Sequence, residues 1–335
     1  MSIQKKNFPG EKSKLKTILT IMVKLKNYFS VFLILVIALI LLFTINAIFQ
    51  KQPGLKKEEI AGNDFLKIVV PLMPKELNFC GEKVPLNDID VKERFERELI
   101  VNTYWHSSTI LILKRSTRWF PVIEPILKRN GVPDDFKYLC AAESNLSNAT
   151  SIANAVGFWQ FVEKTAKQYG LKITKEIDER YSVEKSTEAA CKYLKEAYSK
   201  YGSWTMAAAS FNIGFDNLDK QIARQKSNDY YDLLFNEETS RYIFRVLAIK
   251  TILLNPENYG YILKKDDYYQ PIPTYEIKIT APINDLADFA KDNSINYKFL
   301  KYFNPWLREN YLPLQKGESY IIKIPKPDAI NISLE

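Results

Sequence analysis

The chain has 335 residues, of which 46% are hydrophobic and 26% are charged, which excludes global disorder and leaves room for one large or two modest domains. Its formal net charge is +8, but residues 1–27 alone hold seven Lys and one Glu. The remainder is therefore nearly neutral, and the basic balance gives little support for a nucleic-acid partner. We expect none.

The cysteine and histidine content excludes further classes of site. The three cysteines Cys80, Cys140 and Cys191 are an odd number, so they cannot form a fully paired disulfide framework. The single histidine, His106, lies in a polar stretch away from any nucleophile motif, so a histidine-based triad is not expected. No spacing of these residues suits a metal ion, and we expect neither a metal site nor a cofactor.

The first predicted element is a membrane-spanning helix at residues 28–49. Residues 31–43 form an unbroken apolar run, and its flanks extend it to about 20 residues, enough to cross a bilayer. Because the Lys-rich residues 1–27 precede it, we expect a cytoplasmic N-terminal tail, one pass through the inner membrane and a periplasmic remainder. A cleaved signal peptide is the alternative, although no small-x-small cleavage site follows the run.

Two regions of different character follow the apolar run. Residues 50–87 read as a linker and N-terminal extension, polar at first and then interrupted by prolines. Residues 88–260 have mainly helical spacing with glycines at the expected helix ends, which predicts a helical domain. The fold class is therefore expected to be mainly α.

The C-terminal residues 272–327 change to a mixed pattern. Residues 275–279 and 320–324 alternate like strands, and residues 283–291 and 297–303 between them have helical spacing. This order predicts a small strand–helix–helix–strand module that is separate from the helical domain.

One carboxylic acid in the helical domain occupies an unusual position. In the helix predicted at 134–144, Phe136, Leu139, Cys140 and Glu143 fall on one face, so a carboxyl group ends an apolar stripe. Burial and the partial negative charge of a helix C-terminus both raise the pKa of a carboxyl group, as a general acid requires. The alternative is a boundary residue that points to water.

Several motifs around this glutamate occur in a specific order. They lie at residues 141–146 (Ala-Ala-Glu-Ser-Asn-Leu), 153–161 (ending Gly-Phe-Trp-Gln-Phe), 165–171, 207–214 (Ala-Ala-Ala-Ser-Phe-Asn-Ile-Gly) and 238–242 (Glu-Thr-Ser-Arg-Tyr). The ordered set resembles the lytic transglycosylase domain of glycoside hydrolase family 23. The resemblance implies a lysozyme-like helical catalytic domain over residues 88–260, with peptidoglycan glycan strands as its partner.

The resemblance also implies a mechanism and a set of roles. Glu143 corresponds to the single catalytic acid/base that cleaves the bond between N-acetylmuramic acid and N-acetylglucosamine and forms a 1,6-anhydro ring. A single carboxylate departs from the usual glycosidase pair but fits assistance by the substrate's own acetamido group. The matching substrate-binding positions are Ser144, Trp159, Gln160, Asn212 and Tyr242. For Trp159 and its neighbour Phe158, packing in the core is the alternative.

The C-terminal module resembles a degenerate LysM domain, a glycan-binding unit. Its two strand-like segments and Asn304-Pro305 carry the likeness, but Ala281-Pro282 replaces the usual Gly-Asp turn. Glycan binding and simple packing both remain open for this module. Trp306 is a candidate sugar platform or a core residue.

One departure from the family pattern concerns activity. Phe211 stands where the family usually has a tyrosine, and the missing hydroxyl weakens the expectation of full activity. Two other functions therefore stay open: a goose-type lysozyme-like hydrolase, which needs further acidic residues to position water, and a non-catalytic peptidoglycan-binding scaffold.

Overall fold

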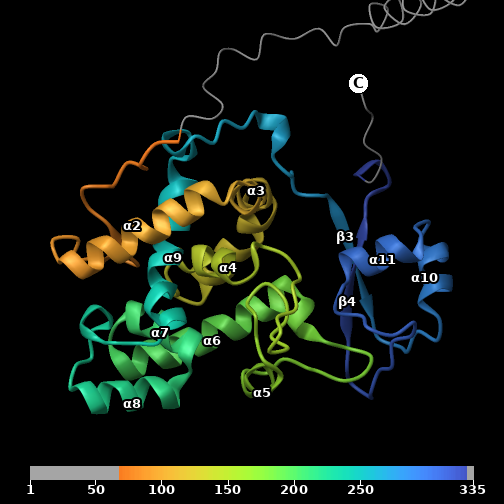
Figure 1. Ribbon diagram of the computed structural model, residues 1–335. Helices are drawn as coiled ribbons and strands as arrows, with labels where there is room; N and C mark the ends of the chain where they lie inside the picture. The colour runs from red at the N-terminus through yellow and green to blue at the C-terminus, as the bar shows by residue number, and fades with distance from the viewer. Residues whose placement is uncertain (1–67, 330–335) are drawn as a thin grey trace, which may run out of the picture. The chain divides into compact units, whose positions relative to one another are not determined.

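The computed structural model describes residues 68–329 (Figure 1). The membrane-spanning helix predicted at 28–49 lies outside this range. Within the described range, no helix is both long enough and apolar enough to cross a bilayer. Residues from Val70 onward belong to one compact unit, which contains both the helical region and the C-terminal module.

The described chain is mainly helical with two small sheets, which confirms the predicted fold class at that level. Its α-helices are α2 Ile89–Tyr104, α3 His106–Arg129, α4 Phe136–Ser144, α5 Glu163–Gln168, α6 Val183–Tyr201, α7 Trp204–Ile213, α8 Phe215–Gln225, α9 Glu237–Leu254, α10 Leu286–Asp292 and α11 Tyr297–Phe303. The sheets pair β1 Asn78–Phe79 with β2 Glu82–Lys83, and β3 Thr274–Ile279 with β4 Tyr320–Pro325.

Short polar side chains fix where several of these helices begin. The side chains of Asp88, Ser182, Ser203 and Asn236 each accept a hydrogen bond from a backbone N–H in the first turn of the helix that follows. Such caps satisfy N–H groups that have no partner inside the helix, and each contributes about 1 kcal/mol. The starts of α2, α6, α7 and α9 are therefore set locally by sequence.

Helix α9 is the centre of the helical core. It packs against α2, α4 and α7, and its Ile243, Phe244, Leu247 and Ala248 have no exposed surface (Figure 1). A helix that is apolar on most sides is stable only when neighbours cover it. Side chains carried by α9 are consequently held on a rigid element.

A buried ion pair joins the end of α9 to the start of α4. The Lys250 ammonium lies 2.7 Å from Asp135 Oδ2 and 2.9 Å from the carbonyl oxygen of Asn78, while the Cys80 N–H donates to the same Asp135 oxygen at 2.6 Å. Burial of one charge without the other would cost several kcal/mol. The β1–β2 hairpin, which the sequence did not predict, thus connects the two helices.

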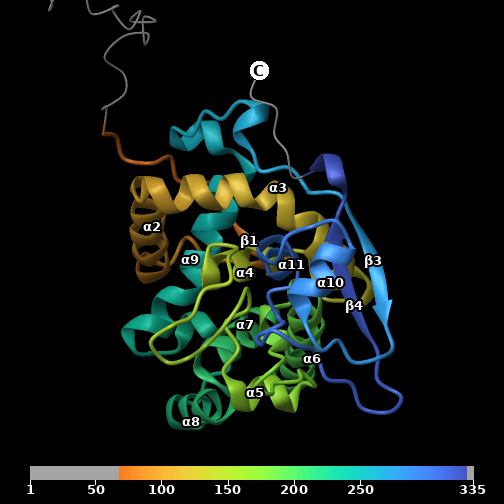
Figure 2. The same ribbon diagram turned by 90° about the vertical axis from the view of Figure 1, so that its right-hand side faces the viewer.

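The C-terminal module has the predicted strand–helix–helix–strand order. β3 and β4 are antiparallel with Ile277 opposite Ile322, and α11 packs on β4 (Figure 2). Trp306 is only 8% exposed and its ring stacks on Tyr320 at 5.3 Å between centroids, so its side chain packs in the module's core. The structure therefore favours the packed alternative for Trp306 over a sugar platform.

The module is joined to the helical region through residues 172–184. The Asp178 N–H donates to the carbonyl oxygen of Trp306 at 2.9 Å, the Arg308 N–H donates to that of Glu176 at 2.7 Å, and the Arg308 guanidinium lies 4.1 Å from the centre of the Tyr181 ring. Ile177 belongs to the module's own apolar core. The module is therefore an integral part of the compact unit.

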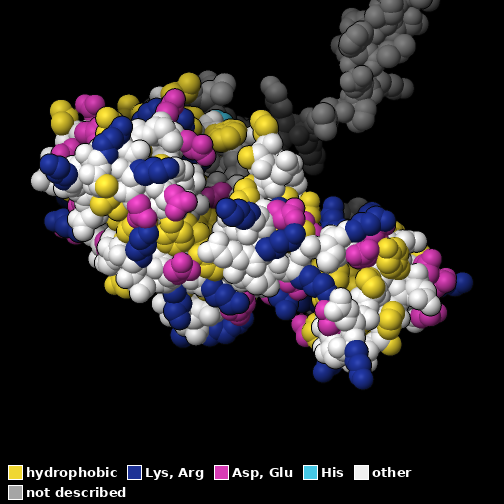
Figure 3. Space-filling model, turned by 90° about the horizontal axis from the view of Figure 1, so that it is seen from below, with side chains coloured by type: hydrophobic (Ala, Val, Ile, Leu, Met, Phe, Trp, Pro, Cys, Tyr) yellow, Lys and Arg dark blue, Asp and Glu magenta, His cyan; other side chains and the backbone are white. Residues whose placement is uncertain are grey.

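Charged side chains of both signs are distributed over the surface. On the face seen in Figure 3, Lys and Arg alternate with Asp and Glu, and apolar side chains gather in a small area near the middle of the helical part. Interspersed charges of this kind keep a protein soluble without generating a strong field of one sign.

Candidate active site

Helix α4 places Glu143 in its last turn. Phe136, Leu139 and Cys140 on the same face have no exposed surface and anchor the helix in the core. Asn145, which follows the helix, has a left-handed backbone conformation with φ of 51°, and this ends the helix. The carboxyl group is thereby held at the C-terminal end of a buried helix, as the periodicity of the sequence predicts.

The surroundings of Glu143 favour its protonated form. Burial is the main cause and raises the pKa of the carboxyl group from its ordinary value of 4.5 to about 7. The Tyr242 hydroxyl, which donates a hydrogen bond to Glu143 Oε1, and the positive charge of Arg245 both lower this pKa, whereas the negative charge of Glu238 raises it. The group can therefore both give and take a proton near neutral pH.

Glu143 opens into a cavity of about 330 Å³. Its walls come from the end of α2, the start of α3, the end of α4 with the following loop, and α9; they are formed by Asn102, Trp105, Ser108, Ala142, Glu143, Ser144, Asn145, Ser147, Ala149, Arg245 and Ile249. The lining combines amides, hydroxyls and one guanidinium with apolar surface from Trp105, Ala142, Ala149 and Ile249. This mixture suits a sugar, which has hydroxyl groups and an apolar ring face.

Ser144 lies at the wall of this cavity but points back into its own helix. Its hydroxyl donates to the carbonyl oxygen of Cys140 at 3.3 Å, and the residue is only 6% exposed. A serine that bonds to the carbonyl four residues earlier satisfies itself locally. In this structure the Ser144 hydroxyl therefore bonds within its own helix and not to the Glu143 carboxyl group.

Gln160 is held in a strained loop beside the cavity. Its backbone has φ of 47°, and its amide nitrogen donates to the carbonyl oxygens of Gly157 at 2.7 Å and Ala149 at 3.0 Å. Since Ala149 lines the cavity, the Gln160 side chain ties the cavity wall to the next loop. A left-handed backbone at a residue other than glycine is uncommon and often accompanies functional sites.

Arg180 packs against the loop of Gln160 and holds it in place. Any side chain at Gly157 would place its Cβ 2.0 Å from the carbonyl oxygen of Arg180, so only glycine fits. The Arg180 guanidinium is paired with Asp178 at 2.7 Å and donates to the carbonyl oxygens of Asn154 and Phe161 at 3.2 Å each. These two charged side chains thus stabilise the conformation of the loop.

The two aromatic residues before Gln160 belong to the core. Trp159 has no exposed surface, and its indole N–H donates to the Thr187 hydroxyl at 2.8 Å; Phe158 is 2% exposed. In this structure Trp159 is therefore a packed side chain and offers no face to a sugar. Phe211 packs against the same group, with its ring centre 6.1 Å from that of Trp159 and 5.1 Å from that of Tyr193.

Asn212 links α7 to the first turn of α9. Its Oδ1 accepts from the Thr239 hydroxyl at 2.8 Å, and its Nδ2 donates to Glu238 Oε1 at 3.4 Å. Asn212 thus contacts Glu238, whose negative charge raises the pKa of Glu143.

Comparison with known proteins connects this geometry to a family. Residues 120–234, which include Glu143, Gln160 and Asn212, match the family model described as Transglycosylase SLT domain. This chain carries a transglycosylase SLT domain. Residues 275–328 match the model described as Soluble lytic transglycosylase C-terminal LysM-like domain, which confirms the LysM-like resemblance of the module.

Two curated relatives extend the similarity. The membrane-bound lytic murein transglycosylase D of Escherichia coli K12 and that of Escherichia coli O6:H1 are each 30% identical to this chain over 261 residues. The match covers 75% of this chain and 56% of each relative, so the chain spans just over half of their length.

Two charged residues near Glu143 were not among the predicted site residues. Arg245 lines the cavity, and Glu238 acts on the carboxyl group through its charge. Arg245 follows Tyr242 by three residues in a helical pattern, and this spacing places both on the same side of the helix. Glu238 opens the Glu-Thr-Ser-Arg-Tyr motif, but its proximity to Glu143 depends on how α9 packs on α4.

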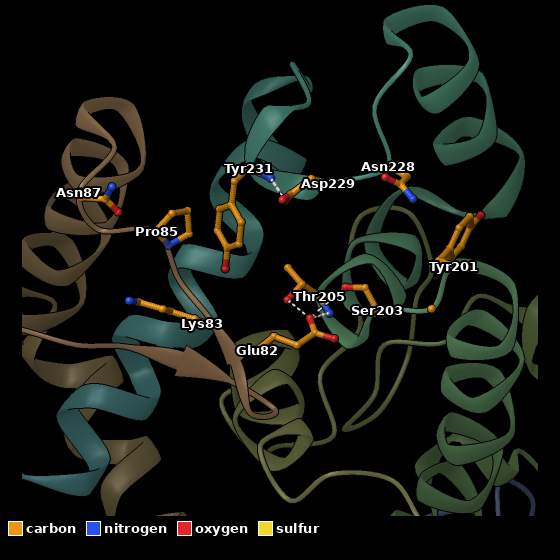
Figure 4. Close-up of a pocket in the computed structure, with 11 residues that line it drawn as sticks. Glu82, Lys83, Pro85, Asn87, Tyr201, Ser203, Thr205, Asn228, Asp229 and Tyr231 are labelled. Atoms are coloured by element: carbon orange, nitrogen blue, oxygen red, sulfur yellow. Dashed lines mark hydrogen bonds between the residues drawn. The ribbon is translucent and has the colours of Figure 1, made fainter.

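A second and larger cleft of about 540 Å³ lies elsewhere on the unit that carries the transglycosylase SLT domain (Figure 4). It also contains a glutamate, Glu82 of β2. The Glu82 carboxylate accepts from the backbone N–H groups of Trp204 and Thr205 and from the hydroxyls of Ser203 and Thr205, at 2.6–2.9 Å. This carboxylate caps the start of α7, and its oxygens accept hydrogen bonds from groups that the fold itself supplies.

Proposed function

We propose that the chain is a peptidoglycan lytic transglycosylase that cleaves the β-1,4 bond between N-acetylmuramic acid and N-acetylglucosamine and leaves 1,6-anhydro ends. The observation that carries the proposal is the Glu143 carboxyl group, with its pKa raised to about 7, in a cavity that offers amides, hydroxyls and a guanidinium within a transglycosylase SLT domain. The relatives named lytic murein transglycosylases support the same activity.

In the first step Glu143 acts as the general acid. Its proton goes to the glycosidic oxygen, the bond from the muramoyl C1 to that oxygen breaks, and the N-acetylglucosamine side leaves as an alcohol. The acetamido oxygen of the muramoyl residue stabilises the positive charge that develops at C1. Glu143 is left as a carboxylate, which the Tyr242 hydroxyl and the Arg245 charge stabilise.

In the second step the same carboxylate acts as the general base. It takes the proton from the 6-hydroxyl of the muramoyl residue while that oxygen bonds to C1, and the 1,6-anhydro ring closes. Glu143 regains its proton and no water is consumed. One carboxyl group with a pKa near the working pH suffices for both steps. The first step leaves the carboxylate that the second step uses as a base, and the second step returns the proton that the first step uses.

Other cavity residues bind and position the glycan in this proposal. The polar groups of Gln160, held beside the cavity wall, contact the sugar, and Asn212 fixes the start of α9 relative to α7. Tyr242 orients the Glu143 carboxyl group through its hydrogen bond. Ser144 contributes as part of the cavity wall.

Glu238 favours one alternative, a lysozyme-like hydrolase. It is an exposed acid whose charge acts on Glu143 and whose oxygen accepts from Asn212, so it is placed to orient an attacking water. In that reaction water, and not the 6-hydroxyl, would attack C1 and leave a reducing end.

Product analysis separates these functions. Peptidoglycan digested with the protein in ¹⁸O-labelled water is examined by mass spectrometry, with the Glu143→Gln variant as the control. We expect anhydro-muramoyl ends without label. Labelled reducing ends would establish the hydrolase, and glycan binding without any product from the wild type would establish a non-catalytic scaffold.

We also propose that residues 28–49 anchor the chain in the inner membrane with the catalytic domain in the periplasm. The apolar run, its Lys-rich N-terminal flank and the membrane-bound relatives support this. Reporter fusions after residue 60 are expected to be active only if the reporter folds outside the cytoplasm. Activity of a cytoplasmic reporter at the same site would contradict the topology.

A further inference from the structure

A guanidinium group in the Glu143 cavity lacks a matching acceptor. Arg245 lines the cavity, and its side chain is 32% exposed. Its one ion-pair contact within residues 68–329 is with Glu98, at 4.0 Å from Nε to Oε2, too long for a hydrogen bond. The N–H donors of this side chain are thus left without an acceptor in the described part of the chain.

Glu98 already accepts hydrogen bonds from two other arginines. It is 1% exposed, and its Oε1 accepts from Arg97 and from Arg241 at 2.6 Å each. Its Oε2 has no hydrogen-bond partner among the described residues. Glu98 therefore holds Arg245 at the cavity wall by charge, without occupying its donors.

The local arrangement of charges leaves Arg245 able to bind an anion. Arg97, Arg241 and Arg245 surround Glu98, and among described residues only Glu237 adds a second carboxylate to this group, at 3.4 Å from Arg241 and 3.8 Å from Arg97. Glu143 is a further acid near Arg245, which lowers the pKa of Glu143 by its charge, but no hydrogen bond joins the two side chains among the described residues. Arg245 therefore faces the cavity with its donors free. A guanidinium presents a planar fork of donors that matches a carboxylate.

We propose that Arg245 binds a carboxylate of the glycan substrate inside the Glu143 cavity and so selects strands that carry a free carboxylate next to the bond to be cleaved. The inference rests on the proposed function and names its substrate class. Two carboxylates have this chemistry: the lactyl carboxylate of a muramoyl residue that has lost its peptide, and a carboxylate of an intact stem peptide.

The test compares three substrates: peptide-free glycan strands, the same strands with every lactyl carboxylate converted to a methylamide, and peptide-bearing strands. We expect the wild type to prefer the peptide-free strands over the methylamides by about 10- to 100-fold in kcat/KM, as a charge-assisted contact supplies. Arg245→Gln removes this preference, mainly through KM. Arg245→Lys keeps part of it, because lysine retains the charge without the fork.

Two controls separate binding from electrostatic tuning. Arg94→Gln removes a guanidinium that also lies near α9, where it donates to the carbonyl oxygen of Ser240, but that does not line the cavity; it should keep the full preference. Because Arg245 lowers the pKa of Glu143, Arg245→Gln should shift the alkaline limb of the pH profile upward for all substrates alike. Only a lost contact changes the ratio between substrates.

The outcomes decide the proposal and the source of the carboxylate. If, relative to the methylamides, Arg245→Gln weakens cleavage of peptide-free strands, the lactyl carboxylate is bound; if it weakens cleavage of peptide-bearing strands alone, a stem-peptide carboxylate is bound. If Arg245→Gln weakens neither relative to the methylamides, the inference is overturned while the proposed function stands.

The inference can also be tested without turnover. Binding of the same strands to Glu143→Gln, with and without Arg245→Gln, reports the carboxylate preference directly. If the wild type cleaves none of the strands, the proposed function fails, and this binding ratio still decides the role of Arg245.

Discussion

Two glutamates in two clefts of the same unit have opposite roles. Glu82 lies in the larger cleft, at the N-terminal end of α7, and accepts from two backbone N–H groups and two hydroxyls. Glu143 lies in the smaller cavity, at the C-terminal end of α4, and accepts from a single tyrosine hydroxyl. The partners of a carboxyl group, and not the size of its cleft, decide whether it is free to react.

The physical reason is the balance between burial and donors. Four donors at the start of α7 hold the Glu82 carboxylate in place, so this group serves the fold. At Glu143 burial outweighs its tyrosine donor and the charge of Arg245, and the pKa rises to about 7. The comparison predicts that the two positions respond differently to the same substitution.

The largest effect is expected for Glu143→Gln. Removal of the proposed acid/base should lower kcat for glycan cleavage by at least about 10³-fold, while the protein stays folded. Release of soluble fragments from peptidoglycan measures the rate, and circular dichroism checks the fold. Near wild-type activity in this variant would end the assignment of Glu143.

The next effect concerns the dependence of stability on pH. The folded-state pKa of Glu143, about 7, lies above its ordinary value of 4.5, so between these values the folded state holds more protons than the unfolded state. The free energy of unfolding should therefore decrease as pH rises from about 4.5 to 7, by up to about 3 kcal/mol from this group. Urea titrations at several pH values measure it against Glu143→Gln, which should lack this component.

Glu82→Gln should affect stability and leave chemistry intact. A neutral amide cannot accept from all four donors at the start of α7, so the free energy of unfolding should decrease by about 2 kcal/mol. Chemical denaturation gives this value, and kcat of the folded fraction should stay within about threefold of wild type. A large fall in kcat with unchanged stability would reverse the roles assigned to the two glutamates.

Tyr242→Phe probes the one donor that Glu143 retains. Loss of the hydroxyl removes stabilisation of the carboxylate formed after the first step, so kcat should fall by about tenfold. Because Tyr242 lowers the pKa of Glu143, the alkaline limb of the pH–rate profile should move upward. An unchanged profile would show that the tyrosine only packs.

The smallest effect is expected for Phe211→Tyr. Phe211 packs edge-on against Trp159, Phe161 and Tyr193, and no polar contact depends on it. An added hydroxyl should change kcat by less than about threefold and preserve or slightly raise activity. A large loss of activity, measured with the same assay, would mean that the position is too tightly packed for a hydroxyl.

The sequence by itself determined most of the helices and the place of the Glu143 carboxyl group at the end of α4. Helical spacing with Ser and Asn caps fixed the starts of α6, α7 and α9, and the apolar stripe of α4 placed Glu143 at its end, because these signals act within one or two turns. The strand–helix–helix–strand order of the module followed in the same way.

Only the tertiary structure decided which groups meet. Tyr242 and Glu143 are 99 residues apart, and Glu82 and Trp204 are 122 residues apart, so neither contact has a local signal. Burial likewise depends on the whole core, so only the structure shows that Trp159 and Trp306 are packed inside it. The free donors of Arg245 also depend on which side chains surround it, and the sequence gives no signal for them. Periodicity tells which side of a helix is apolar, but the packing of helices determines what that side faces.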